Sequence, residues 1–88
     1  MEIFRTDGSG KSYSNKRLFD LVSLVGEYTE DDFFINIKSI NDHKGLLVIE
    51  INDLVNVEYT FSVFQTFWHT FNEYCIELRF NNQIIKEV

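Results

Sequence analysis

The sequence lacks the marks of a disulfide-bonded, secreted or membrane-spanning protein. Its single cysteine, Cys75, excludes an internal disulfide, which favours a reducing compartment. The longest uninterrupted apolar stretches, such as residues 45–49, are only a few residues long and cannot cross a bilayer. Residues 1–5 also lack the apolar core of a signal peptide. We therefore expect a cytoplasmic protein with no membrane partner.

Basic residues are scarce as well, and the shortage is uneven along the chain. The formal net charge is −6 at pH 7, from 8 Lys and Arg against 14 Asp and Glu. Residues 1–22 hold four basic and three acidic residues, whereas residues 23–88 hold four basic and eleven acidic ones. Because an acidic surface repels phosphate backbones, we expect no direct binding of nucleic acid. A partner protein with a basic surface is favoured, and charge would raise its association rate more than its affinity.

The composition is that of one globular domain spanning residues 1–88. Hydrophobic residues make up 44% and charged residues 25%, which argues against disorder. The sequence shows no repeat, linker or low-complexity tract that would divide the chain. A chain of this length buries only about 60–65% of the surface that it exposes when unfolded.

Aromatic residues are abundant, and half of the fourteen are crowded into sixteen positions. Neither proline nor glycine interrupts this run, which contains Tyr59, Phe61, Phe64, Phe67, Trp68, Phe71 and Tyr74. Three of them, Tyr59, Phe67 and Tyr74, are expected at the surface, and the other four in the core. Exposed aromatic side chains bury a large area at little entropic cost, so they commonly anchor protein interfaces.

The spacing of apolar residues predicts a helix at about 14–25. Four of them follow the i, i+3, i+4, i+7 pattern of one helical face, namely Leu18, Leu21, Val22 and Val25. Ser14 is a suitable N-cap and Gly26 a suitable residue to end the helix.

Alternating apolar and polar residues predict β-strands in the rest of the chain. Three such segments, 33–40, 46–51 and 55–63, are joined by short turns and predict an antiparallel meander over 33–63. A further alternation begins at Ile76, and the Asn81-Asn82 turn predicts a hairpin over 76–88.

Residues 55–74 also fit a helix. A helical stripe is formed by Val57, Phe61, Phe64, Trp68, Phe71 and Cys75. Because β-branched and aromatic residues dominate before Val63, we favour a strand over 55–63, followed by a helix at about 64–74. The predicted fold is therefore α+β, with an antiparallel sheet of four to six strands packed by two helices, at about 14–25 and 64–74.

The sequence offers no arrangement that predicts catalysis, a cofactor or a metal site. Residues 8–12 resemble half of a phosphate-binding loop, but Arg5 stands where the loop needs its first glycine. His69 and Glu73 are spaced as two metal ligands on a helix, yet no third ligand accompanies them. Cys75 and His69 would lie on different sides of a helix, unlike a nucleophile and its base. We expect a protein that is not an enzyme.

The basic residues near the start of the first predicted helix indicate an alternative site. A helix N-terminus favours anions, and Lys11, Lys16 and Arg17 would lie beside it. These three residues are candidates for holding an anion or an acidic residue of a partner.

The acidic residues before the first predicted strand indicate the main candidate interface. Glu30, Asp31 and Asp32 are consecutive, and Glu27, Asp42, Asp53 and Glu58 extend the negative charge so that it mimics nucleic-acid phosphates. In size and charge the chain resembles small phage-encoded inhibitors and toxin-neutralising immunity proteins, a resemblance that implies an inhibitor or immunity function.

We expect a non-enzymatic module that docks on a partly basic protein as an inhibitor, immunity or accessory protein. Its predicted interface comprises Glu30, Asp31, Asp32, Tyr59, Phe67 and Tyr74. The alternatives are a homodimer or another homo-oligomeric structural component, and a small anion-binding domain that uses Lys11, Lys16 and Arg17.

Overall fold

A computed structural model describes residues 16–88 of the chain. Its elements in chain order are helix α1 (Lys16–Tyr28), the short 3-10 helix η3 (Phe33–Asn36), strands β1 (Ile37–His43) and β2 (Leu46–Ile51), helix α2 (Val57–His69), and strands β3 (Cys75–Phe80) and β4 (Gln83–Glu87). The predicted N-cap Ser14, the candidate anion ligand Lys11 and the glycine-rich segment 8–12 lie outside the described residues.

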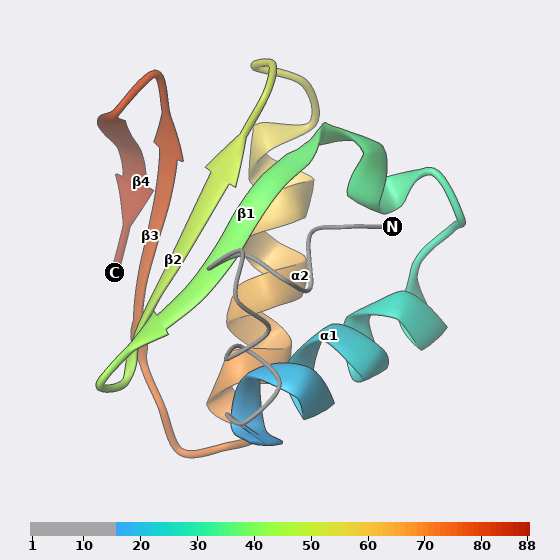
Figure 1. Cartoon of the computed structure of the whole chain (residues 1–88), viewed down its shortest axis with the longest axis vertical. Helices are drawn as coiled ribbons and strands as arrows, with labels where there is room; N and C mark the ends of the chain where they lie inside the picture. Colours follow the sequence, from blue (N-terminus) through green and yellow to red (C-terminus); the bar gives the residue numbers. More distant parts are fainter. Residues whose placement is uncertain (1–15) are drawn as a thin grey trace.

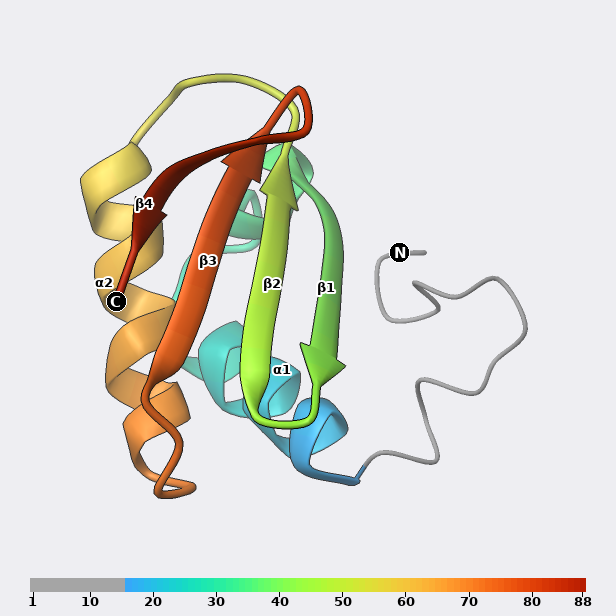
Figure 2. The ribbon, with the colours of Figure 1, turned by 90° about the vertical axis from the view of Figure 1, so that its left-hand side faces the viewer.

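The four strands form one mixed sheet in the order β1-β2-β3-β4 (Figure 1). β1 pairs antiparallel with β2, and β3 pairs antiparallel with β4, so each outer strand belongs to a tight hairpin. The two central strands, β2 and β3, run parallel because α2 carries the chain back along the sheet between them. Both helices lie on the same face of the sheet (Figure 2).

The α+β class is confirmed, whereas the purely antiparallel sheet is wrong. Residues 55–63 form no strand: after β2 the chain passes through a loop, and α2 begins at Val57. In a strand, neighbours point to opposite faces, yet Thr60 and Phe61 are both buried while Tyr59 is half exposed. Burial of the helical stripe that includes Phe64 therefore outweighs the β propensity of this segment.

The predicted strand at 33–40 is wrong in its first half. Residues 33–36 form η3, in which Phe34 is buried and Ile35 points to solvent, the reverse of the expected alternation. The strand itself is β1, from Ile37 to His43, and it turns into β2 through Lys44 and Gly45. Both turn residues have positive φ angles, 56° and 98°, as a two-residue hairpin requires.

The first helix and the last hairpin agree more closely with the sequence. All four residues of the predicted stripe in α1 are buried, but the helix continues through Gly26 to Tyr28. The C-terminal hairpin is confirmed, and Asn81 and Asn82 take the left-handed conformations expected of them, with φ angles of 52° and 64°.

The core is a single cluster between the sheet and the two helices. Its largest fully buried side chains are Trp68, Phe64, Leu21, Ile40, Leu47, Ile49, Ile76 and Leu78. The expected burial of Phe61 is confirmed, while Phe71 is only partly buried and packs beside Trp68 with 6.0 Å between ring centroids. Within residues 16–88, neither helix combines the length and apolar character that a bilayer span requires.

Truncation of Phe64 tests the helical assignment of α2 and its place in the core. The ring is fully buried between α2 and the sheet, so Phe64→Ala should lower the free energy of unfolding by about 3–5 kcal/mol. Urea denaturation measures this change. Ile84→Ala is the control, because this exposed strand residue should alter stability by less than about 0.5 kcal/mol. Equal midpoints for the two variants would contradict the described core.

Candidate functional site

A pocket of about 390 Å³ lies where η3 meets the loop between β2 and α2. These segments come together because β1 begins and β2 ends at the same end of the sheet (Figure 1). We call this the η3 pocket. Its acidic lining residues are Glu30, Asp32 and Asp53, and its apolar ones include Ile35, Val55 and Tyr59.

Hydrogen bonds fix the two walls of the η3 pocket to each other. The side-chain amide of Asn36 donates to the carbonyl oxygen of Asp53, and its Oδ1 accepts from the Asp53 backbone N–H, both at 2.8 Å. The backbone N–H of Asn52 donates to the carbonyl oxygen of Asn36 at 2.9 Å. The loop then enters α2 through Asn56, whose φ of 53° is left-handed. Segments seventeen residues apart are thus held as one platform.

The platform presents apolar side chains to solvent. Ile35 is 71% exposed, and Leu54 and Val55 are each more than half exposed. Tyr59 is half exposed, and its ring meets the edge of Phe33 at 5.9 Å between centroids. Phe33 in turn packs against the core ring of Phe64, so the chain of ring contacts connects Tyr59 to the hydrophobic core.

The acids beside these apolar side chains have no basic partner within residues 16–88. Glu30, Asp31, Asp32 and Asp53 are all exposed, and none forms an ion pair in the described part of the chain. Five other acids form ion pairs: Asp20 with Lys16, Asp42 and Glu73 with Arg17, Glu77 with Arg79, and Glu58 with Lys86. Uncompensated negative charge therefore gathers around an apolar centre.

The structure brings three of the six predicted interface residues together at the η3 pocket. Glu30 and Asp32 line the η3 pocket with Tyr59, and Asp31 lies between the two acids in sequence. Phe67 and Tyr74 lie elsewhere along or beyond α2. Phe67 is half-buried and packs edge-on against Tyr28 at 5.4 Å, and the exposed Tyr74 packs beside His69 at 4.9 Å.

Sequence reasoning missed the apolar centre of this surface. Ile35 falls within the predicted strand 33–40 and Val55 begins the predicted strand 55–63, so the sequence does not mark either of them as part of an exposed surface. The available signal was Asn36, Asn52 and Asp53, polar residues that flank the apolar ones and are suited to holding loops. Nothing local reveals that the two stretches touch.

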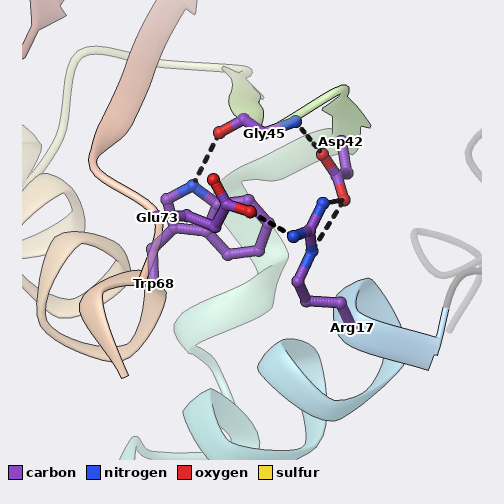
Figure 3. A network of polar contacts seen from close by, with 5 residues as sticks. All are labelled: Arg17, Asp42, Gly45, Trp68 and Glu73. Carbon is purple, nitrogen blue, oxygen red and sulfur yellow. Dashed lines mark hydrogen bonds and ion pairs between the residues drawn. The ribbon is translucent and has the colours of Figure 1, made fainter. Parts of the chain in front are cut away.

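A second polar cluster surrounds Arg17, at the opposite end of α2 (Figure 3). The Nη2 and Nε groups of Arg17 donate to Oδ2 of Asp42, at 2.9 and 3.3 Å, and Nη1 donates to the carboxylate of Glu73. The guanidinium also lies over the Trp68 ring, 5.3 Å from its centroid. We call this cluster, together with Gly45, the Arg17 network.

Gly45 completes the network from the hairpin turn. Its carbonyl oxygen accepts from Nε1 of Trp68 at 3.1 Å, and its N–H donates to Oδ1 of Asp42 at 2.9 Å. A side chain at Gly45 would place its Cβ 2.8 Å from Oε1 of Glu73, and the φ of 98° disfavours any such residue. The position therefore depends on glycine.

The charge of Arg17 stabilises the folded structure through its pairing with Asp42 and Glu73. The hydrogen bond to Asp42 raises the pKa of Arg17 above its ordinary value, although partial burial opposes this. A raised arginine pKa contributes stability that is fully present below the ordinary arginine pKa and is lost only as the pH rises above it. The charge of Arg17 therefore adds no pH dependence to folding near neutrality.

Two of the three candidate anion ligands lie in the described residues, and both are engaged by acids of the chain itself. Arg17 is engaged by Asp42 and Glu73, and the exposed Lys16 pairs with Asp20 at 3.0 Å along the helix. Lys11 lies outside the described part. In residues 16–88 no group of three His, Cys, Asp or Glu side chains is placed to hold a metal ion.

Comparisons of the chain with protein-family models, with curated proteins and with solved structures found no match.

Removing Arg17 should destabilise the fold much more than removing its neighbour. Arg17→Met removes the guanidinium that pairs with the carboxylate of Asp42, which is only 1% exposed, and should cost about 2–4 kcal/mol of unfolding free energy. Lys16→Met removes an exposed helical pair and should cost less than about 0.5 kcal/mol. Urea denaturation of both variants checks the difference.

A double variant tests whether Arg17 and Asp42 act as a pair. Arg17→Met combined with Asp42→Asn should cost clearly less than the sum of the two single changes, because each single change already removes the interaction between the two groups. Strict additivity would contradict a coupled network.

Proposed function

We propose that this protein is a non-enzymatic binding module that docks on a partly basic surface of another protein through the η3 pocket and its surroundings. In this role it acts as an inhibitor, immunity or accessory protein in the cytoplasm. The observation that carries the proposal is the coincidence, on one platform, of exposed apolar side chains with acids that have no basic partner within residues 16–88.

The composition of this surface supports protein binding. Protein interfaces commonly have an apolar, aromatic centre and a polar rim. Here Ile35, Leu54, Val55 and Tyr59 provide exposed apolar area, and the neighbouring acids provide charge of one sign. A basic partner would be drawn by that charge and would then bury the apolar centre.

The hydrogen bonds that hold the walls of the η3 pocket together also support the proposed protein binding. Ordering a mobile loop on binding consumes free energy that would otherwise contribute to affinity. The bonds between Asn36 and Asp53 hold the loop in the free protein, so this cost is met during folding.

The same charge argues against a homodimer formed through this face. A twofold contact places a surface against its own copy, so Asp32 and Asp53 would meet acids of the second subunit. Like charges brought together in an interface are unfavourable. A partner of opposite charge fits this surface better than a second copy does.

Affinity capture from the native host tests the proposal. The immobilised protein should enrich a partner protein, and Ile35→Ser should lose that partner because it removes the most exposed apolar side chain of the surface. Ile84→Ser is the matched control: Ile84 is an exposed isoleucine on β4, far along the chain from η3, and the variant should retain the partner. Quantitative mass spectrometry reads out both results.

Salt dependence of association with the purified partner gives a second measure. Between about 0.05 and 0.5 M salt the association rate constant should fall about tenfold or more, since screening removes electrostatic steering. Docking through this face would be contradicted if the parent protein and Ile35→Ser captured the partner equally, or if the association rate constant did not change with salt concentration.

A further inference from the structure

We propose that the η3 pocket receives an arginine side chain of the partner protein, held between the carboxylates of Asp32 and Asp53 and the ring of Tyr59. The inference rests on the proposed protein-binding function and names the group that the pocket recognises. It follows from the mixture of chemistries in one pocket, from its unpaired charge, and from a comparable arrangement elsewhere in the molecule.

The lining of the pocket selects a side chain that is apolar along its length and cationic at its tip. Ile35 and Val55 offer apolar contact, whereas Asp32 and Asp53 offer carboxylates from two different segments. An apolar anchor would cover those carboxylates without supplying a hydrogen-bond donor, which is unfavourable. Lysine and arginine have methylene stems that lie on apolar surface while their charged ends reach polar groups.

The aromatic wall favours arginine over lysine. The ring of Tyr59 is steadied by Phe33, which meets it at 84° between ring planes. A planar guanidinium stacks on such a ring and donates in a fork to carboxylates, whereas an ammonium group acts as a compact point charge.

The Arg17 network is an example, within this protein, of carboxylates and an aromatic ring that bind an arginine side chain. There a guanidinium donates to two carboxylates, of Asp42 and Glu73, and lies over the ring of Trp68 (Figure 3). The η3 pocket is lined by Glu30, Asp32 and Asp53 and by the aromatic residue Tyr59, but residues 16–88 supply no cation to it. Its volume of about 390 Å³ has room for one long side chain and a little of the segment that carries it.

An NMR titration of the full chain with short blocked peptides tests this inference. The probes are acetyl-Gly-Arg-Gly-amide, the matching lysine peptide and the matching citrulline peptide, which keeps the shape of arginine without its charge. The arginine peptide should bind with a dissociation constant on the order of millimolar and should shift the amide signals of Ile35, Asp53 and Tyr59 most. The lysine peptide should bind more weakly, and the citrulline peptide should give no saturable shift.

Variants assign the contributions of the individual groups. Asp32→Asn combined with Asp53→Asn should weaken the arginine peptide about three- to tenfold, as expected for two exposed charge contacts. Glu87→Gln is the control, because it neutralises an exposed acid on β4 and should leave the affinity unchanged. Tyr59→Leu should remove the preference for arginine over lysine.

Two results would overturn the inference: equal binding of the citrulline and arginine peptides, or shifts that fall outside the η3 pocket. These are distinguishable from failure of the proposed function. A partner that is lost on Ile35→Ser but retained by the Asp32→Asn, Asp53→Asn variant leaves the docking surface in place and overturns arginine recognition. Arginine-peptide binding at the pocket, together with unchanged capture by Ile35→Ser, supports the chemistry of the pocket and overturns the docking function.

Discussion

The guanidinium of Arg17 joins three parts of the chain that are far apart in sequence. It extends from the first turn of α1 to Asp42 at the end of β1 and to Glu73 just beyond α2, and it covers the ring of Trp68. The apolar face of α1 would pack against the sheet in more than one position, because apolar contacts are not directional. A forked guanidinium between two carboxylates fixes the position, since its donors accept partners only in certain directions.

The network also fixes the hairpin turn between β1 and β2. Asp42 and Trp68 bind the N–H and the carbonyl oxygen of Gly45, so the turn is tied to the end of α2. β2 leaves that turn through the centre of the sheet, and α2 returns the chain so that β3 can pair parallel with β2. Buried polar groups that are fully hydrogen-bonded make such an arrangement specific, whereas an unpaired one would be costly. In residues 16–88 no buried side-chain nitrogen or oxygen lacks a hydrogen-bond partner.

The two ends of α2 therefore have different roles. Its last turn belongs to the Arg17 network, in which charges are paired and partly buried. Its first turn forms part of the η3 pocket, where Tyr59 lies beside acids that lack a cation in the described chain. Both ends combine carboxylates with an aromatic ring, but only the network contains the basic residue as well.

Several features follow from the sequence alone, because each depends on neighbours along the chain. The buried stripe of α1, the C-terminal hairpin with its two asparagines, and the acidic character after residue 22 are all local patterns. The sequence also identifies Glu30, Asp31, Asp32 and Tyr59 as candidates for an interface. It does not show that three of them, Glu30, Asp32 and Tyr59, line one pocket.

Tertiary structure decided the conformation of residues 55–63, the parallel pairing in the sheet and the contacts between distant residues. Residues 55–63 satisfy both a period of two and a helical period, and burial of Phe61 and Phe64 beneath the sheet selects the helix. The same choice makes the sheet mixed, because the helix returns the chain to the end of the sheet at which β2 begins, and β3 then runs parallel to β2. Contacts such as Arg17 with Glu73, or Asn36 with Asp53, join residues 56 and 17 positions apart. Such pairs leave no periodic trace in a single sequence, because their partners become neighbours only when the chain is folded.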